Sequence, residues 1–325
     1  MNYFFILAVS FIIVFLITPN IRYLALKFYA IDRINQRKIH KKVVTKLGGL
    51  AIYLGFLGGL CIIVLLDSIF FQIYHIPIVG ILIGSTLVLI LGIYDDFQGS
   101  SAILKFAIQL IISLLIIKSG FLLRGILIPG LINIKFGIFS IPITLLWLVG
   151  ITNAVNLMDG LDGLAAGISG ITLIFIFIFG LILNDNFIIY TSLALAGACF
   201  AFLKYNFYPA KIFMGDTGSL FLGLIIACLG AYQPLRYQLN PYFIPVAILL
   251  FLPILDTTFA VARRIIRKKS IFSGDSSHIH HYFIKLGFNQ VQTVIRFYLM
   301  TFIFGVISLS VLFFILKLEK FYGYN

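Results

Sequence analysis

The sequence has little charge and very little cysteine. Charged side chains make up 11% of the 325 residues, and only 11 residues are acidic. The three cysteines, Cys61, Cys199 and Cys228, lie in apolar runs without the spacing of a metal site or polar neighbours that would activate a thiol, so they are predicted to be small buried hydrophobic residues. A hydrophobic content of 61% is more than one soluble core could bury, which excludes a soluble domain and indicates an integral membrane protein.

Long linkers, low-complexity tracts and internal repeats are also missing, so residues 1–325 are predicted to form a single transmembrane domain. Apolar runs of about 16 to 25 residues, the length of a membrane-spanning helix, recur along the whole chain. They lie at about 3–19, 47–67, 76–94, 102–118, 138–155, 164–183, 187–205, 218–233, 242–262 and 292–316. The predicted fold is an all-α, polytopic transmembrane helical bundle of about ten spans. Between the fourth and fifth runs, alternating apolar residues around Pro129 and Gly130 predict a short hairpin over residues 120–139.

The distribution of Lys and Arg predicts the orientation of the bundle. The first run follows no basic residue and precedes no small-residue cleavage pattern, so it is predicted to be a span with the N-terminus outside, not a signal peptide. If the spans alternate, all but six of the 24 Lys and Arg residues lie in or beside the loops after the odd-numbered spans. The six are Lys118, Arg124, Lys135, Arg236, Lys317 and Lys320. By the positive-inside rule those loops are cytoplasmic, which predicts a multi-pass protein of the cytoplasmic (inner) membrane.

The net charge of +13 is concentrated beside the predicted spans. This placement fits contact with anionic membrane lipids or a phosphorylated substrate, and nucleic acid is not expected as a partner.

Five stretches on the predicted cytoplasmic side contain the clustered Lys and Arg residues, six of the ten Asp residues and four of the five His residues. These stretches are 33–49, 95–96, 153–162, 206–218 and 263–287. Ionisable groups are costly in so apolar a chain, and their repeated placement at one face predicts a shared polar site there.

Asp95 and Asp96 end the third apolar run. Two adjacent acids repel each other unless a cation lies nearby, and Mg²⁺ takes one or two carboxylates together with phosphate oxygens. A solvated helix end is the simpler alternative for this pair. Lys105 lies about three turns further on in the fourth run, where a buried ammonium needs an anionic partner, so it is predicted to contact a substrate phosphate.

The segment 153–164 carries four polar residues where a plain turn needs one or two. Asn156, Asp159 and Asp162 are three residues apart, so a helical continuation would place them on one face. Gly160 and Gly163 would allow a sharp turn and a close approach of backbone to a ligand.

The segment 213–219 opens the eighth run with Phe213 and Asp216. Asp216 and Thr217 could have a purely structural role as the N-terminal cap of the helix that follows. An acid at a Gly-flanked turn, preceded by an aromatic ring, also suits a metal ligand beside a base-stacking platform.

Three histidines, His278, His280 and His281, follow a basic cluster in the loop after the ninth run. On a helix, His278 and His281 would share a face and His280 would point away, which is not the spacing of a two-histidine zinc pair. Hydrogen bonding at phosphate oxygens is the functional interpretation, and an ordinary basic flank is the alternative for the cluster. Residues 37–40 and Lys46 bring further cations before the second run.

Together these stretches supply carboxylates for a divalent metal, phosphate-binding cations and an aromatic platform at a membrane surface. This combination is typical of phosphoryl transfer to or from a lipid, where catalysis is mostly positioning and charge neutralisation.

The motifs in 153–164, 213–219 and 278–281 resemble those of the polyprenyl-phosphate N-acetylhexosamine-1-phosphate transferases, the family that includes MraY and the WecA- and TagO-type enzymes. The His-x-His-His form is more similar to the WecA type. The resemblance implies a Mg²⁺-dependent enzyme, with Mn²⁺ as the alternative ion. It would transfer N-acetylhexosamine-1-phosphate, with GlcNAc expected, from a UDP-sugar to undecaprenyl phosphate. The products would be polyprenyl-diphospho-sugar and UMP, and the reaction would start cell-envelope glycan synthesis, as in cell-wall and lipopolysaccharide assembly.

The resemblance also implies roles for single residues. Asp216 would hold the metal with help from Asn156, and Phe213 would stack on uracil. The implied catalytic residues are Asp95, Asp96, Asp159 and Asp162, with the first two positioning or deprotonating the lipid phosphate and Asp162 near the nucleoside. The implied substrate-binding residues are Lys46, Lys105, Phe213, His278, His280 and His281.

Three positions depart from the family pattern. Gly99 stands where a third Asp or Asn often follows the acidic pair, which leaves Asp95 and Asp96 as the working acids. Thr45 stands where Pro is common, and Ser276 replaces a frequent basic residue, so these two bear on substrate preference.

Two other functions use similar residues. An ion-coupled transporter would place acids near the bilayer midplane, where Asp256, after Pro253, is the one acid at some depth. A prenyltransferase also uses paired acids and Mg²⁺, but would not require the Phe213 or histidine motifs. Within the transferase interpretation, a single displacement is favoured, an aspartyl-phosphate intermediate is the second route, and a homodimer stays open.

Overall fold

The computed structural model describes residues 3–32, 44–237, 239–270 and 278–322. Their helices are α1 (Tyr3–Lys27), α2 (Gly48–Leu66), α3 (Ser68–Gln98), α4 (Ala102–Lys118), α5 (Ser140–Met158), α6 (Leu164–Leu183), α7 (Asn186–Asn206), α8 (Gly215–Ala231), α9 (Phe243–Leu249), α10 (Phe251–Ile266), α11 (Ile279–Lys285) and α12 (Gln290–Tyr322). Two antiparallel pairs of strands, β1 (Ile31–Asp32) with β2 (Val44–Thr45) and β3 (Gly125–Ile128) with β4 (Ile132–Lys135), complete the described secondary structure together with a short 3-10 turn at Gly137–Phe139. The all-α class is confirmed.

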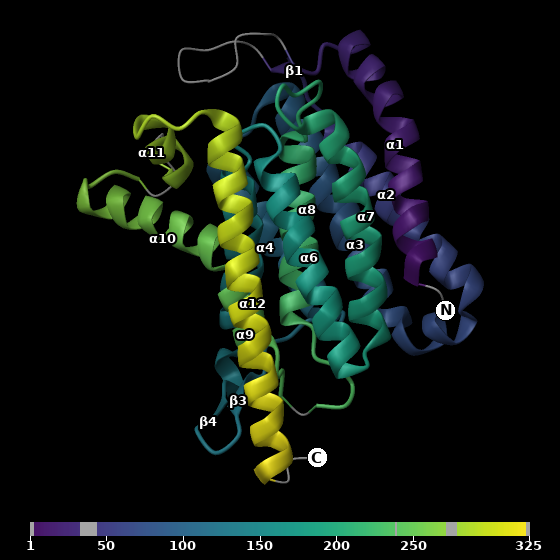
Figure 1. Cartoon of the computed structure of the whole chain (residues 1–325), viewed down its shortest axis with the longest axis vertical. Coiled ribbons are helices and arrows are strands. Elements are labelled where there is room, and N and C mark those ends of the chain that lie inside the picture. Colours follow the sequence, from purple (N-terminus) through teal and green to yellow (C-terminus); the bar gives the residue numbers. More distant parts are fainter. Residues whose placement is uncertain (1–2, 33–43, 238, 271–277, 323–325) are drawn as a thin grey trace.

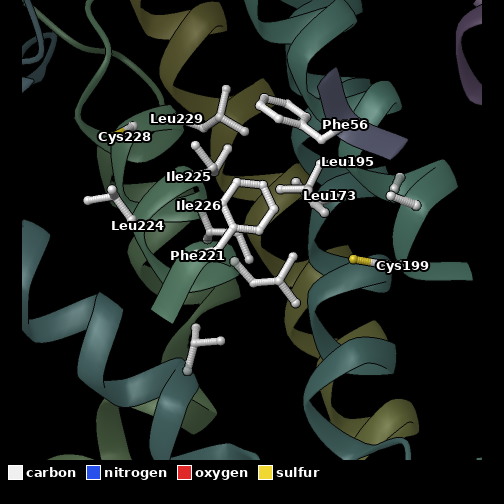
Figure 2. Packing of buried hydrophobic residues seen from close by; sticks show 14 of the residues in the cluster. Phe56, Leu173, Leu195, Cys199, Phe221, Leu224, Ile225, Ile226, Cys228 and Leu229 are labelled. Atoms are coloured by element: carbon white, nitrogen blue, oxygen red, sulfur yellow. The ribbon is translucent and has the colours of Figure 1, made fainter. Parts of the chain in front are cut away.

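Helix α8 has apolar side chains on all of its faces, and its residues 217–231 are buried, so it lies at the centre of the bundle. It packs against α5, α3 and α2, and the pair α6 and α7 packs beside it with α1 on the outside (Figure 1). Figure 2 shows Phe221 and Ile225 of α8 facing Phe56 of α2 and Leu195 of α7, all fully buried.

Two of the three cysteines lie in this core. Cys199 and Cys228 are buried among the apolar side chains (Figure 2), as predicted. The same prediction is wrong for Cys61, which is exposed because its face of α2 turns away from the neighbouring helices.

Seven described helices are long and apolar enough to cross a membrane, which confirms a multi-pass protein. The pair α9 and α10 would make an eighth span if it crossed as one unit. The other two predicted spans, α4 and α8, have 17 residues each, at the lower limit for a crossing of about 17–25 residues. The count of about ten spans is therefore not confirmed and stays a prediction, as does the orientation.

The predicted ninth span, 242–262, is not one continuous helix. Helices α9 and α10 meet at an angle of 70° at Leu250, and in Figure 1 α10 points sideways out of the bundle. Pro253 accounts for the break, since it has no N–H to donate to the carbonyl of Leu249 and its ring crowds the preceding turn.

The hairpin predicted over residues 120–139 is confirmed, whereas its location on the outer side stays a prediction. Strands β3 and β4 pair antiparallel from Gly125 opposite Lys135 to Ile128 opposite Ile132, with Pro129 and Gly130 in the turn. Figure 1 places this hairpin at the opposite end of the bundle from β1 and α11.

The segment that leads into α2 is fastened to the start of α8. Thr45 forms a parallel bridge with Ile212, and the N–H groups of Gly48 and Gly49 donate to the carbonyls of Phe213 and Met214, each at 2.9 Å. A Cβ on Gly49 would lie 2.0 Å from the backbone nitrogen of Gly218, so the Gly-Gly pair allows two helix ends to touch.

This contact predicts that Gly49→Ala lowers the free energy of unfolding by about 3 kcal/mol, because the backbone of Gly218 has no room to move away. Thermal unfolding of the purified protein in detergent measures the effect. Gly150→Ala on α5 is the matched control, since nothing lies within 4 Å of its added Cβ and it should unfold at or above the wild-type temperature. Equal unfolding temperatures for the two variants would contradict the close approach.

Candidate active site

Three charged side chains from different helices meet at the ends of α3, α4 and α8. The ammonium of Lys105 donates to Asp216 Oδ2 at 2.8 Å and lies 3.3 Å from Asp95 Oδ2. The other oxygen of Asp95 accepts from the backbone N–H of Ser100 at 2.8 Å. Lys105 therefore bridges the carboxylates of Asp95 and Asp216, which are 121 residues apart in the sequence.

Asn156 joins this group from α5. Its amide donates to Asp216 Oδ1 at 3.1 Å and to Ser219 Oγ at 2.8 Å, and Ser219 Oγ donates in turn to the carbonyl of Gly215 at 3.0 Å. We call Asp95, Lys105, Asn156 and Asp216 the charge cluster. The sequence predicted all four, whereas Ser219 was not singled out because a Ser in the first turn of a helix is unremarkable by itself.

The charge cluster has the donor chemistry of a Mg²⁺ site. In the part of the chain that the structure describes, no group of three or more His, Cys, Asp or Glu side chains is arranged as a closed metal cage. Mg²⁺ does not require one, since it takes one or two carboxylates and fills its remaining positions with water and substrate phosphate. Asp95 and Asp216 already hold a cationic group, the Lys105 ammonium, between them. Their carboxylates and the Asn156 amide fit a second small cation.

Asp96 faces a different partner from Asp95. Its Oδ1 accepts from the N–H of Asp216 at 3.1 Å, and its Oδ2 accepts from the N–H and the hydroxyl of Thr217 at 3.0 and 2.7 Å. A carboxylate at a helix N-terminus satisfies unpaired N–H groups and interacts favourably with the helix dipole. The α8 cap predicted at Asp216 and Thr217 is thus supplied from outside the helix, by Asp96 of α3.

Lys46 lies between two acids, 3.4 Å from Asp32 Oδ1 and 3.7 Å from Asp96 Oδ1. Burial lowers the pKa of Lys46, but the charges of Asp96 and Asp32 outweigh burial and raise it above its ordinary value. Lys46 is therefore positively charged at neutral pH, and 26% of its side chain stays exposed to meet an anion.

The loop between α5 and α6 carries Asp159 and Asp162. Burial raises the pKa of Asp159 well above its ordinary value, and the nearby charges of Asp216 and Asp96 add to this. Asp159 therefore holds a proton more readily than an exposed aspartate does.

Asp162 is engaged in fastening two loops together. Its Oδ2 accepts from the N–H of Ala210 at 2.9 Å, in the segment before α8. Asn206 completes the connection, accepting from the N–H of Gly163 at 3.1 Å and donating to the carbonyl of Ile212 at 3.0 Å. These bonds place the Asp159 loop beside Phe213. The role of Asn206 had no local signal, because one of its partners, Gly163, is 43 residues away in the sequence.

Phe213 is held by its backbone at the edge of the site. Its N–H donates to the carbonyl of Thr45 at 2.8 Å, and its carbonyl accepts from Gly48. The residue is half-buried just before α8, next to the charge cluster, where a flat ring would suit a nucleobase.

The three histidines form one cluster. His280 and His281 have ring centroids 4.4 Å apart, and His278 lies 5.6 Å from His280 and 6.5 Å from His281. The arrangement expected for a continuous helix, with His280 pointing away from the other two, does not apply, because His278 precedes α11 in an extended conformation.

His280 connects this cluster to the Asp159 loop. A Cβ on Gly160 would lie 2.4 Å from its Nε2, so only glycine lets the ring approach this loop. Burial, followed by the charges of His281 and His278, lowers the pKa of His280 to about 3. The ring is therefore neutral at pH 7, and among the described residues neither ring nitrogen has a hydrogen-bond partner.

From the sequence, Asp256 is the acid that an ion-coupled transporter would use. The structure places it in a pair with His278, whose Nδ1 lies 2.8 Å from Asp256 Oδ2. It is thus an acid engaged with the histidine cluster.

The bend between α9 and α10 opens an apolar cavity of about 680 Å³ next to α5. Its walls include Trp147 and Ala154 of α5, Phe243 of α9, and Thr257 and Val261 of α10. Helix α5 therefore carries the cavity wall and, two residues after Ala154, the Asn156 of the charge cluster.

Two predicted features lie outside the described residues. They are the cations at Arg37, Lys38 and His40, and the Ser276 substitution.

Comparisons with known proteins identify the family of the chain. The sequence profile described as glycosyl transferase family 4 matches residues 78–232, which include the charge cluster. A probable undecaprenyl-phosphate N-acetylglucosaminyl 1-phosphate transferase of Bacillus subtilis is 42% identical over 92% of this chain and 82% of its own. A decaprenyl-phosphate N-acetylglucosaminephosphotransferase of Mycolicibacterium smegmatis is 33% identical over 93% and 80%, and a phospho-N-acetylmuramoyl-pentapeptide-transferase of Clostridium perfringens is 36% identical over 61% and 63%.

The different partners of the two adjacent acids predict different effects on stability. Asp96→Ala should lower the free energy of unfolding by about 2 kcal/mol, because it leaves the N–H groups of Asp216 and Thr217 without their acceptor. Asp95→Ala should cost less than about 1 kcal/mol, since Lys105 keeps Asp216 as a partner. Thermal unfolding in detergent compares the two, and a larger loss for Asp95→Ala would show that the capping assignment is wrong.

Proposed function

The chain belongs to glycosyl transferase family 4, and from this premise we propose that it transfers N-acetylglucosamine-1-phosphate from UDP-N-acetylglucosamine to a polyprenyl phosphate. The products are polyprenyl-diphospho-N-acetylglucosamine and UMP. The relatives from Bacillus subtilis and Mycolicibacterium smegmatis, both named for this sugar and for a polyprenyl phosphate, support the choice of substrates. The product would be the lipid-linked first unit of a cell-envelope glycan.

The observation that carries the proposal is the charge cluster, in which Lys105 lies between the carboxylates of Asp95 and Asp216. A polyprenyl phosphate has an apolar chain and an anionic end, and the UDP-sugar has a diphosphate. Helix α5 contributes Ala154 to the wall of the apolar cavity and Asn156 to the charge cluster, so the protein has both an apolar surface for a lipid chain and a polar site for phosphates. The cations Lys105 and Lys46 supply the positive charge that phosphates require.

Asp216 and Asp95, with Asn156, are the residues that would hold Mg²⁺. When bound, the ion would neutralise charge on the diphosphate and on the departing UMP. Lys105 would contribute to the same neutralisation from its position between the two carboxylates.

The proposed reaction is a direct displacement. An oxygen of the lipid phosphate forms a bond to the β-phosphorus of the UDP-sugar, and the bond from that phosphorus to the oxygen bridging the two phosphates breaks, with the electron pair leaving on UMP. A phosphate monoester is largely ionised at pH 7, so it needs little help from a base.

The alternative route through an aspartyl-phosphate is supported less well. Both oxygens of Asp96 accept hydrogen bonds from the start of α8, and Asp95 is bound to Ser100 and Lys105. The raised pKa of Asp159, caused first by burial and then by neighbouring acids, favours its protonated form, which is a poor nucleophile.

The remaining predicted residues surround this reaction. Phe213 would stack on uracil, Asp162 would keep the nucleoside side of the site in place through Ala210, and the histidine cluster would face the sugar or its phosphate. We place the site on the cytoplasmic face of the inner membrane, on the strength of the Lys and Arg distribution.

The role of Lys105 predicts that Lys105→Ala lowers kcat/KM for UMP release by about 10²- to 10³-fold, since a charge that stabilises the leaving phosphate is lost. Lys118→Ala is the matched control, because Lys118 is an exposed lysine at the other end of α4 and should leave the rate unchanged. Equal rates in the two variants would remove Lys105 from the mechanism.

The function itself is tested by UMP release from detergent-purified protein given undecaprenyl phosphate, Mg²⁺ and a panel of UDP-N-acetylsugars. We expect release with UDP-N-acetylglucosamine that requires the lipid, stops with EDTA, returns with added Mg²⁺ and falls at least about 100-fold in Asp216→Asn. No release with any donor, from protein that unfolds cooperatively on heating, would refute the proposed function.

A further inference from the structure

We propose that Asp256 is a positioning residue that fixes the protonation of His278, so that the Nε2 of His278 is the nitrogen presented to the substrate. This inference rests on the proposed function, since it makes His278 part of the same site. It assigns a role to the one buried acid of α10.

Both oxygens of Asp256 are engaged with the segment that starts α11. Oδ2 lies 2.8 Å from His278 Nδ1, and Oδ1 accepts from the N–H of Ile279 at 2.8 Å. Asp256 is 0% exposed and His278 is 7% exposed, so water does not compete for these bonds. The two contacts orient the imidazole from both its ring and its backbone.

The chemistry of the pair decides where the proton is. An ionised carboxylate only accepts hydrogen bonds, so the Nδ1 facing it must carry a hydrogen. Nε2 is then the ring nitrogen that can change its role, as an acceptor in the neutral ring or as a donor to a phosphate oxygen in the charged one. His280 and His281 are the other titratable groups that lie against His278, and the first of them is held neutral by burial.

A purely structural role, in which Asp256 holds the start of α11 in place, does not explain why this buried residue is an aspartate. The bond to Ile279 uses one oxygen, and an uncharged acceptor would make it equally well. Burying a carboxylate costs desolvation energy that well-packed apolar groups avoid, so this contact is weak support for a role in stability. The second oxygen, Oδ2, accepts a hydrogen bond from Nδ1 of His278 and so fixes which ring nitrogen carries the proton.

The position of Asp256 ties the histidine to the bent helix. Thr257 and Val261 on α10 line the apolar cavity, while Asp256 on the same helix holds His278. The helix that would contact the lipid chain therefore also sets the orientation of a side chain at the reacting end.

The test is Asp256→Asn in the full-length protein. Asparagine has the same shape and can still accept from Ile279, but it presents an NH₂ group to Nδ1, which then loses its proton. We expect kcat to fall by about 10²- to 10⁴-fold, as for a triad histidine whose carboxylate becomes an amide, with KM for the UDP-sugar within about threefold of wild type. The unfolding temperature should stay close to the wild-type value.

The protonation is measured independently of activity, by NMR of the detergent-solubilised protein labelled with ¹⁵N-histidine. The chain has five histidines, so His278→Gln identifies the signal. We expect a protonated Nδ1 at His278 in the wild type and its loss in Asp256→Asn. Should Nδ1 remain protonated in the variant, or kcat stay at the wild-type value, the positioning role is overturned.

Asp185→Asn is the matched control. Asp185 is also a buried aspartate at a helix N-terminus, accepting from the N–H of Ile188 at 3.2 Å, and it should change neither kcat nor the His278 signal. An equal loss of kcat in this control would show that buried caps in general, and not this pair, affect the rate. Absence of UMP release in the wild type, with the expected change of the His278 signal, would refute the proposed function and leave the pair standing.

Discussion

Carboxylates that are placed in an apolar helix bundle need cations beside them, and the whole site follows from how this requirement is met. Lys105 lies between Asp95 and Asp216 and offsets one of their two negative charges, and Asp96 is paired with Lys46 and with the N–H groups that start α8. Each cation comes from a different segment than the acids it serves. The charges therefore hold together the ends of three helices, and the same charges have the chemistry that a diphosphate and Mg²⁺ would use.

Contacts to the backbone hold the segments that carry these charged side chains in place. The glycine pair before α2 touches the first turn of α8, and Asp162 with Asn206 fastens the Asp159 loop to the segment that carries Phe213. These residues touch no reacting atom in the proposed mechanism. They keep the charged side chains at fixed separations, which matters because displacement at phosphorus depends mostly on positioning.

The bend at Leu250 affects both the apolar cavity and the polar contact between Asp256 and His278. It turns α10 away from the bundle, opens the apolar cavity beside α5, and brings Asp256 to His278. A polyprenyl phosphate combines an apolar chain with a charged end, so a protein acting on it needs both an apolar wall and a polar site. In this chain the helix after the proline-associated break carries cavity-lining residues such as Val261 together with Asp256, which holds His278.

The sequence by itself determined the helical class, the membrane location, the hairpin over residues 120–139 and the residues of the charge cluster, because these depend on local composition and on the high cost of charge among apolar residues. It did not determine that Asp95 and Asp96 face different partners, that the ninth apolar run is broken, or that Asp256 meets His278. Adjacent residues on a helix differ by about 100° in direction, so their partners depend on which helices lie nearby. Such contacts join residues far apart in the chain, and only the tertiary packing decides them.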